Sequence, residues 1–324
     1  MGPPTFRLVA LASSLALSHG TRRSPVAAGG ERLLMYSSHG GLGNQLIALE
    51  SAWAFADILN RTLVVAPILE HGASAYGSRC RSSEKERQLA VSALAHYNKH
   101  GASGQSLYDL LTFSRRVVRF DPRLHSRPTI ATNEMSLACT GTADWWTPLA
   151  KRREHLIMVG STFKHRVALD AKSALERSYT WKPQLPWAAL VSRLGQYVCA
   201  YVRWPDSGHR DAAKVVFSPR ASTGNVTTAP PDAVYVASEH EASALCKAAA
   251  PLHKKGGRCF TLAHMPGGLR GFSVATTRAV ADVYACSRAT EGGYCASYHT
   301  STFWKAIRML SDQKNAFPAA CQGI

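Results

Sequence analysis

Residues 32–67 read RLLMYSSHGGLGNQLIALESAWAFADILNRTLVVAP, and this stretch decides the fold class. An apolar run at 32–37 is typical of a buried strand, and a glycine-rich turn follows it. Apolar side chains then recur at helical spacing from about residue 44 to residue 60. A second apolar run, at 62–67, ends at a proline. The order strand, turn, helix, strand is one βαβ unit, so we expect its two strands to be parallel.

The glycine turn matches neither of the common phosphate-binding fingerprints. After Gly43, the chain continues with Asn44 and Gln45 instead of the Lys and Ser or Thr of a Walker loop, and Leu46 stands where a dinucleotide fingerprint needs its third glycine. What remains is a turn that leads into a helix N-terminus, where glycines let a ligand approach backbone N–H groups. The amide of Asn44 can hold a sugar hydroxyl or a phosphate oxygen. The alternative is a tight turn that needs glycine for its dihedral angles.

The rest of the chain alternates in the same way, except between residues 70 and 150, where we expect short helices and insertions. Further strands are expected at 155–160, 196–203, 232–238, 258–262 and 292–297. Helices are expected at 185–195, 239–252, 273–289 and 300–312. We therefore predict an α/β protein with an N-terminal Rossmann-like domain over residues 31–168 and a C-terminal one over residues 169–315.

The N-terminus and the cysteines both favour the secretory pathway. In residues 1–20, an arginine precedes an apolar run from Leu8 to Leu17, which is typical of a signal peptide; a short signal-anchor is the alternative. Eight cysteines without a CxxC pair favour disulfides over a zinc site, although Cys199 lies in an apolar run that suits a buried thiol. We expect the protein in the lumen of the endoplasmic reticulum or Golgi, or secreted, with a membrane contact only if the N-terminal segment is an uncleaved anchor.

The formal net charge of +17 favours an anionic partner. The Lys and Arg residues are scattered, and no motif that reads nucleic acid accompanies them. We therefore do not expect nucleic acid as the partner.

Polar residues follow two strands of the second half at their C-terminal ends, where open α/β sheets bind ligands. Arg203 can offer a guanidinium fork to a pyrophosphate, and Asp206 follows it closely. Ser238 and Glu239 end the next strand and suit a guanine base or ribose hydroxyls. The alternatives are an ordinary surface ion pair for the first two residues and a helix cap for the second two.

A hydroxyl-rich segment precedes the last helix. Ser301 and Thr302 lie at its expected N-terminus, which is an anion site by geometry, and Phe303 is available to stack on a base. A plain N-cap with Phe303 in the core is the alternative.

Together these blocks resemble the GDP-fucose O-fucosyltransferases, above all the protein O-fucosyltransferases. That family has G-x-x-G-N-Q before a helix that ends in N-R-T-L-x-V-P, and this chain has GGLGNQ and AFADILNRTLVVAP. The later family blocks H-x-R-x-x-x-D, V-Y-[VI]-A-[ST]-[DE] and S-S-F correspond here to YVRWPD, VYVASE and STF. The resemblance covers residues 32–312. It implies a GT-B architecture and an inverting, metal-independent transfer of fucose from GDP-fucose to a hydroxyl of a protein or glycan acceptor, without a cofactor.

The resemblance also implies a role for each matched residue. Arg203 would bind the β-phosphate and stabilise the leaving GDP, and Asn44 would contact the fucose and the diphosphate, so these two are the expected catalytic residues. The expected donor-binding residues are Gly41, Leu42, Gly43, Asn44, Arg203, Asp206, Ser238, Glu239, Ser301, Thr302 and Phe303. The donor is expected on the C-terminal domain and the acceptor on the N-terminal one.

Several positions depart from the family pattern. Tyr201 replaces the family's His, Asp206 is one residue closer to the arginine than in the family, Glu239 stands where Asp is usual, and Gly41 replaces an Arg of one branch. The first turn offers no carboxylate as a general base, which leaves His39 as a candidate. A pseudoenzyme of the same fold, and a transferase for another nucleotide sugar, are therefore alternatives.

Overall fold

The structure is a computed structural model of the chain, in which residues Glu31–Ile324 form one compact unit. It describes residues 31–38, 40–69, 83–100, 106–131, 147–162, 179–183, 185, 187–203, 233–238, 242–249, 258–261, 274–290, 293–297 and 302–311. The predicted signal segment 1–20 and the predicted domain boundary at residues 168 and 169 lie outside the described residues.

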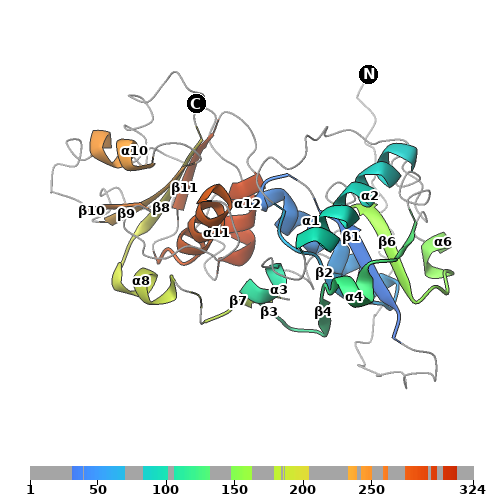
Figure 1. The fold of residues 1–324 in the computed structure, drawn as a ribbon. Helices are drawn as coiled ribbons and strands as arrows, with labels where there is room; N and C mark the ends of the chain where they lie inside the picture. Colours follow the sequence, from blue (N-terminus) through green and yellow to red (C-terminus); the bar gives the residue numbers. More distant parts are fainter. Residues whose placement is uncertain are drawn as a thin grey trace, which may run out of the picture. The chain divides into compact units, whose positions relative to one another are not determined.

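The first sheet has five parallel strands in the order β4-β2-β1-β6-β5 (Figure 1). Its strands are β1 (Leu33–Ser37), β2 (Thr62–Val65), β4 (Val117–Arg119), β5 (Thr129–Ile130) and β6 (Leu156–Ser161). The helix α1 (Leu42–Ile58) connects β1 to β2, and Leu33 pairs with Thr62 in parallel register. The predicted βαβ unit is therefore confirmed.

The helix α1 is apolar on most of its surface because it is covered on several sides. It contacts β1 and β2 of the first sheet, and also the helices α11 and α12 of the second half. A helix that is apolar all round is expected in such a buried position. At its end, Asn60 adopts a positive φ of 48°, and Arg61 N–H donates to the carbonyl oxygen of Ala56 at 2.8 Å. This left-handed residue ends the helix and turns the chain into β2.

Short helices were predicted between the first βαβ unit and β6, but the structure contains a long helix there. The helix α2 (Ser83–His100) has 18 residues and packs on β6 and β1. Its buried face is made mainly of Ala90, Ala93 and Tyr97, and small alanines give only a weak apolar period. The short strands β4 and β5 were also not predicted. The remaining elements of this region are α3 (Leu107–Leu110), β3 (Leu111–Phe113), α4 (Pro122–His125), α6 (Thr147–Ala150) and β7 (Tyr179–Trp181), with β3 and β7 paired antiparallel.

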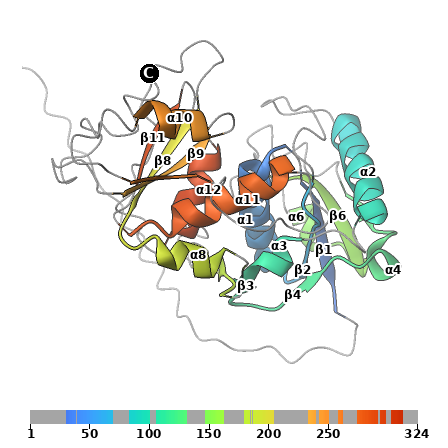
Figure 2. The same cartoon turned by 60° about the vertical axis from the view of Figure 1, so that its left-hand side comes forward.

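The second sheet has four parallel strands in the order β10-β9-β8-β11 (Figure 2). Its strands are β8 (Val198–Arg203), β9 (Ala233–Ser238), β10 (Arg258–Phe260) and β11 (Gly293–Ser297), and its helices are α8 (Ala188–Arg193), α10 (Ala242–Ala249), α11 (Val274–Ser287) and α12 (Thr302–Leu310). Every one of these elements was predicted, because each strand is an apolar run bounded by polar or glycine residues. None of the described helices is both long and apolar enough to cross a membrane.

Two disulfides join described residues of the second half. Cys199 of β8 bonds to Cys286 of α11, and Cys246 of α10 bonds to Cys259 of β10. The expected pairing of cysteines is therefore confirmed for these four, and the alternative of a buried thiol at Cys199 is wrong. Its apolar surroundings reflect its complete burial, and the sulfur meets its partner on the helix that covers the strand.

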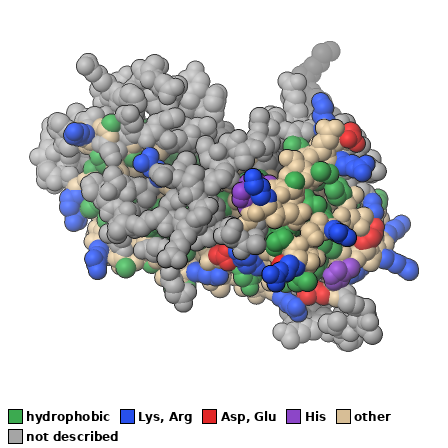
Figure 3. Space-filling model, viewed as in Figure 1, with side chains coloured by type: hydrophobic (Ala, Val, Ile, Leu, Met, Phe, Trp, Pro, Cys, Tyr) green, Lys and Arg blue, Asp and Glu red, His purple; other side chains and the backbone are tan. Residues whose placement is uncertain are grey.

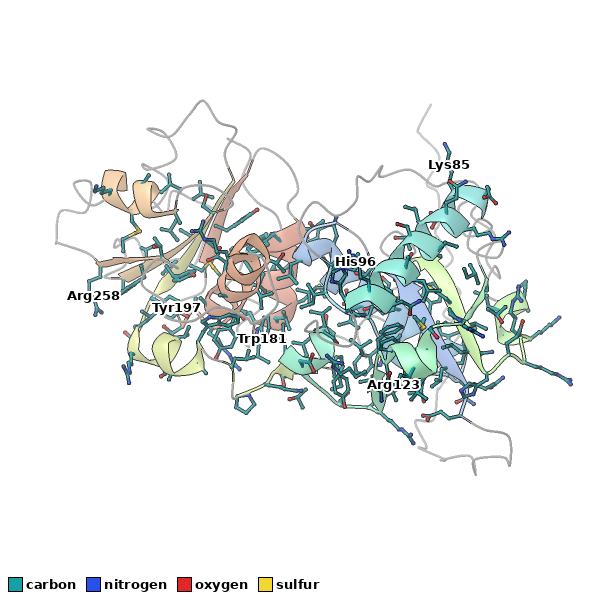
Figure 4. The ribbon with its side chains drawn as sticks, in the orientation of Figure 1. Lys85, His96, Arg123, Trp181, Tyr197 and Arg258 are labelled. Atoms are coloured by element: carbon teal, nitrogen blue, oxygen red, sulfur yellow. A yellow bond between two sulfur atoms is a disulfide. The ribbon has the colours of Figure 1, made fainter. Side chains whose placement is uncertain are left out.

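The helix α11 is the centre of the packing in the second half. Trp181 Nε1 donates to Ser287 Oγ at 2.8 Å, and its ring meets the edge of Tyr284 at a centroid distance of 5.3 Å. Tyr197 O–H donates to the carbonyl oxygen of Ala285 at 2.7 Å. Figure 4 shows Trp181 and Tyr197 beside this helix. These bonds fix α11 to β7 and to the segment before β8.

Candidate functional site

Three strands of the second sheet end side by side, and the ends of two of them carry predicted site residues. Ser297 at the end of β11 is in register with Arg203 at the end of β8, and Val202 is in register with Ser238 at the end of β9. Ligands of open parallel sheets bind outside such C-terminal strand ends. The backbone of Arg203 is thus placed at the predicted edge, while its side chain lies outside the described part of the structure.

The C-terminal end of β1 is held by a buried tyrosine of α2. The backbone N–H of Ser38 donates to Tyr97 Oη at 2.7 Å, and Tyr97 O–H donates to the carbonyl oxygen of Tyr36 at 3.4 Å. Burial raises the pKa of Tyr97 above its ordinary value, so the hydroxyl stays neutral and can make both bonds. The glycine turn therefore starts from a fixed point.

Within the turn, Gly40 is required for its backbone conformation. Its φ is 70°, and a Cβ built there would lie 2.5 Å from Asn44 Nδ2. Only glycine combines that left-handed conformation with such close contact. The side chain of Asn44 thus folds back over the turn, where its amide is half-buried. One interpretation of this turn was that it needs glycine for its dihedral angles. Gly40 agrees with that interpretation, because its backbone is left-handed.

Gln45 is a site residue that the sequence reasoning did not single out. Its Nε2 donates to the carbonyl oxygens of Gly40 at 2.8 Å and Leu69 at 2.9 Å, and its Oε1 accepts from the N–H of Leu69 at 2.9 Å. The side chain is 1% exposed. Gln45 therefore clamps the glycine turn to the segment after β2. Its place beside Asn44 in the GNQ motif was the available signal.

Gly43 brings the first half against the second. A Cβ built on Gly43 would lie 2.6 Å from the backbone nitrogen of Phe303 and from the carbonyl carbon and oxygen of Thr302. The glycine thus lets the first turn of α1 touch the first turn of α12. Only four residues separate α12 from the end of β11, so this contact lies next to the strand ends that carry Arg203 and Ser238.

The meeting of these two helix starts favours an anion. Neither first turn contains an acidic residue, and Gly41 at the N-cap of α1 makes no side-chain capping bond. Each helix N-terminus carries a partial positive charge, and two such ends in contact repel one another. A phosphate or diphosphate at this point would offset that repulsion, because helix N-termini favour anions.

Phe303 packs on protein in this structure. Its ring stacks on Tyr201 of β8 at a centroid distance of 5.0 Å and an interplanar angle of 24°. Tyr201 is buried, and Phe303 is half-buried. The tyrosine that replaces the family's His therefore supports the aromatic residue at the start of α12. The sequence left two interpretations of Phe303, which were stacking on a base and packing in the core. The structure contains the packing contact.

The predicted site residues divide into those that the structure places and those that it does not describe. Gly43 meets Thr302 and Phe303 at the helix contact, and Gly41, Leu42 and Asn44 lie beside it at the start of α1. The backbones of Arg203 and Ser238 lie at the adjacent strand ends. Asp206, Glu239 and Ser301, and the candidate base His39, lie outside the described residues.

Beneath these strand ends lies a buried carboxyl group. Tyr235 O–H of β9 donates to Asp282 Oδ1 of α11 at 2.7 Å. Burial raises the pKa of Asp282 to about 8, against the smaller opposing effects of the Tyr235 hydrogen bond and the charge of Arg278. This pair lies at the middle of β9, away from its end, so it supports the sheet from below.

Solved structures share this arrangement of elements. The crystal structure of NodZ alpha-1,6-fucosyltransferase soaked with GDP-fucose matches with a TM-score of 0.50 at 17% identity, over 87% of this chain and 93% of that one. The structure of the fucosyltransferase NodZ from Bradyrhizobium gives the same TM-score at 16% identity, over 87% and 94%. The chain shares the fold of NodZ. The predicted α/β fold of GT-B type is therefore confirmed.

One curated relative matches over a short stretch. O-fucosyltransferase 30 of Arabidopsis thaliana is 49% identical over 49 residues, which are 15% of this chain and 10% of that protein. The matched stretch thus spans a tenth of the relative's length. No family model matches the sequence. The resemblance to GDP-fucose fucosyltransferases that the sequence blocks indicated is confirmed.

Proposed function

We propose that the chain is a GDP-fucose-dependent fucosyltransferase that transfers fucose to a hydroxyl of a protein or glycan acceptor. Its main support is the contact of the N-termini of α1 and α12 at Gly43, beside the C-terminal strand ends of the second sheet. That arrangement suits a nucleotide diphosphate. The fold shared with NodZ, whose crystals were soaked with GDP-fucose, supports GDP-fucose as the donor.

In this proposal the helix starts act on the leaving group. Negative charge develops on the β-phosphate as the bond to fucose breaks, and dipoles that are already oriented stabilise that charge without reorganisation. Arg203, at the end of β8, supplies a full positive charge and a fork of N–H donors to the same phosphate. Asn44, whose amide is held over the glycine turn, contacts the sugar end of the donor.

The nucleoside is assigned to the ends of β8 and β9. Ser238 is described at the end of β9 and is half-buried there. Asp206 and Glu239 are proposed to bind the guanine and ribose, and Ser301 to bind the diphosphate. We further propose that the transfer inverts the anomeric centre and needs no metal or cofactor, because the arginine and the two helix N-termini supply the positive charge.

We place the enzyme in the lumen of the secretory pathway. The disulfides Cys199–Cys286 and Cys246–Cys259 suit an oxidising compartment. The plant O-fucosyltransferase relative supports the same location. A protein or glycan that passes through that lumen is the proposed acceptor.

Calorimetric titration of the secreted protein with GDP, UDP and ADP tests the donor. We expect GDP to bind most tightly, and equal affinity for the three nucleotides would refute the assignment. Release of GDP from GDP-fucose in the presence of acceptors, with and without a chelator, then tests turnover and metal independence. A product whose anomeric configuration equals that of the donor would overturn the inverting mechanism.

Arg203→Ala tests the assigned catalytic charge. We expect transfer to fall about 100-fold or more, with Arg203→Lys recovering part of it because Lys keeps the charge but loses the fork. The matched control is Arg193→Ala, at an exposed position at the end of α8, which should leave transfer unchanged. Near-normal transfer by Arg203→Ala would remove Arg203 from this role.

A second candidate is a donor-binding pseudoenzyme of the same fold. Its support is Tyr201, which replaces the family's His and stacks under Phe303. GDP binding without GDP release across a panel of acceptors would favour this candidate over the transferase.

A further inference from the structure

The edge of the first sheet that faces away from the proposed site is lined with arginines. Four strands start within two residues of an arginine: Arg32 precedes β1, Arg61 precedes β2, Arg116 precedes β4, and Arg127 lies two residues before β5. The fifth strand, β6, starts after the sequence KRREH at residues 151–155. Because all five strands are parallel, these starts lie along one edge. We call this row of residues the basic edge.

The register of the strands sets the length of the row. Leu33 pairs with Thr62 and with Leu156, and Thr129 pairs with Ile157, so the residues before these strands are neighbours across the sheet. Neighbouring strands are about 4.8 Å apart, and four such spacings give a row of about 19 Å. The sheet order makes it Arg116, Arg61, Arg32, the 151–155 segment and Arg127.

Few acidic groups balance this edge. Among the residues that lead into the five strands, Glu31 pairs with Arg116 at 2.9 Å and Glu154 pairs with Arg152 at 2.9 Å. Arg32, Arg127, Lys151 and Arg153 make no ion pair with a described residue, and the last three are exposed. Figure 3 shows Lys and Arg side chains over this half with fewer Asp and Glu side chains between them.

Arg61 is the buried arginine of the basic edge. Its surroundings show that the positive charges of this edge lie close together. Arg61 is 7% exposed and donates to the carbonyl oxygens of Leu33 at 3.2 Å, Glu154 at 2.8 Å and Arg152 at 2.7 Å. Burial lowers the pKa of Arg61, and the charge of Arg32 lowers it further. The charge of Glu154 opposes this by raising the pKa, and the charge of Arg152 has a smaller lowering effect. Repulsion among these cations is therefore built into the edge, and an anionic ligand relieves it.

We propose that the basic edge binds a linear acidic polysaccharide through its carboxylates. A chain laid across the starts of β1, β6 and β5 meets the cations that no described acidic group pairs, which are Arg32, Lys151, Arg153 and Arg127. An arginine fork matches a carboxylate with two parallel hydrogen bonds. The exposed Arg127, Lys151 and Arg153 make the first contacts. This surface is separate from the donor site, so the proposal does not depend on fucose transfer.

Other linear polyanions fit the edge less well. The residues that lead into the strands include no Phe, Tyr or Trp on which the bases of a single-stranded nucleic acid would stack. An acidic peptide that adds to a sheet pairs alongside an edge strand, whereas the row crosses the strand starts. The row is also only one residue deep. A flat membrane surface would therefore contact fewer cations here than on a broad basic face.

The test measures binding of fluorescently labelled oligogalacturonate, a chain with one carboxylate on each sugar, by anisotropy. The variant is the triple Arg127→Glu, Lys151→Glu, Arg153→Glu. The control is the triple Arg193→Glu, Lys247→Glu, Arg258→Glu, which changes the net charge equally at three exposed positions of the second half. Figure 4 labels Arg258 on the second half and Arg123 on the first.

We expect the basic-edge triple to weaken binding about tenfold and the control triple to stay within about twofold of the parent protein. Binding should weaken as salt is raised, and oligomers shorter than the row should bind less tightly. GDP affinity and the melting temperature are measured for every variant, which separates this result from the donor site and from unfolding. A glutamine triple at the same three positions replaces any glutamate triple that fails to fold.

Four outcomes would overturn the proposal. Equal losses in the two triples would mean that only net charge matters. Equal binding of polyglutamate would assign the edge to an acidic peptide, and tighter binding to anionic vesicles would assign it to a membrane. No measurable binding by the parent protein at low salt would remove the proposal entirely.

Discussion

Replacing Gly43 by alanine should separate the two helix starts at the proposed donor site. The new Cβ would lie 2.6 Å from three backbone atoms of Thr302 and Phe303, whereas carbon atoms in contact normally stay about 3.5 Å from their neighbours. The first turns of α1 and α12 must therefore move apart by about 0.9 Å. Both partners are backbone, so no side chain can rotate to make room.

That displacement should affect ligand binding more than stability. Overpacking costs about 1–3 kcal/mol, and alanine in place of glycine returns about 1 kcal/mol through helix propensity. The net loss in the free energy of unfolding is then on the order of 1 kcal/mol. A hydrogen bond to phosphate stretched by this amount passes its limit. Losing one such charged bond lowers GDP affinity about 10- to 100-fold.

The assay pairs calorimetric GDP titration with urea unfolding of Gly43→Ala and of a matched control. Gly160→Ala is that control, because its Cβ would lie at the same 2.6 Å, but from the side-chain Oε2 of Glu86 in the first half. We expect the control to keep its GDP affinity. Gly43→Ala with unchanged GDP affinity would refute the proposal that the helix contact forms the diphosphate site.

Three further predictions concern stability. Asp282 keeps its proton in the folded protein up to about pH 8, whereas it loses the proton near pH 4 in the unfolded chain. As the pH rises between these two values, the free energy of unfolding therefore falls by about 1.4 kcal/mol per pH unit. Asp282→Asn should flatten that dependence in urea unfolding at pH 5 and 7.5, and an unchanged slope would contradict the burial argument. Replacing Cys199 and Cys286 together by alanine opens a loop with a sequence separation of 87; thermal unfolding should show a loss of about 4.6 kcal/mol or less. The control replaces Cys246 and Cys259 together by alanine, which opens a loop with a sequence separation of only 13 and should cost less. Gln45→Met removes three hydrogen bonds, two of them buried, and should cost about 3 kcal/mol; a cost near zero in urea unfolding would show that the clamp is not needed.

The sequence predicts the central strands of both sheets well because they are buried on both faces, whereas it misses β4 and β5, which are only partly buried at the edges of the first sheet. The runs at β1, β8 and β9 are almost continuously apolar, and glycine or polar residues end each of them. Parallel pairing follows from the helices between them. The α2 helix escapes prediction because two of its four buried residues are alanines and one is Glu86, so its buried face gives only a weak apolar period.

The site is only partly predictable, because its decisive contacts join distant parts of the chain. The sequence motifs contain Gly43 and Thr302 at distant positions. They do not show that position 43 is glycine so that the backbone of Thr302 can pack against it. The same holds for Tyr201 under Phe303, and for Gln45, whose partners lie on both sides of it in sequence. A local pattern gives the residue types of a site, whereas the contacts that arrange them require the tertiary fold.

The two disulfides also impose an order on biosynthesis. Cys246 and Cys259 are 13 residues apart and leave the ribosome almost together, whereas Cys199 must wait for Cys286, a further 87 residues along the chain from it. During that interval Cys199 is unpaired and can react with either cysteine of the short pair. Closing a short loop costs less entropy than closing a long one. If Cys199 bonds to Cys246 before Cys259 has left the ribosome, the correct bond of the strand that ends at Arg203 requires thiol exchange after synthesis. Yield from an oxidising cell lacking disulfide isomerase should suffer accordingly.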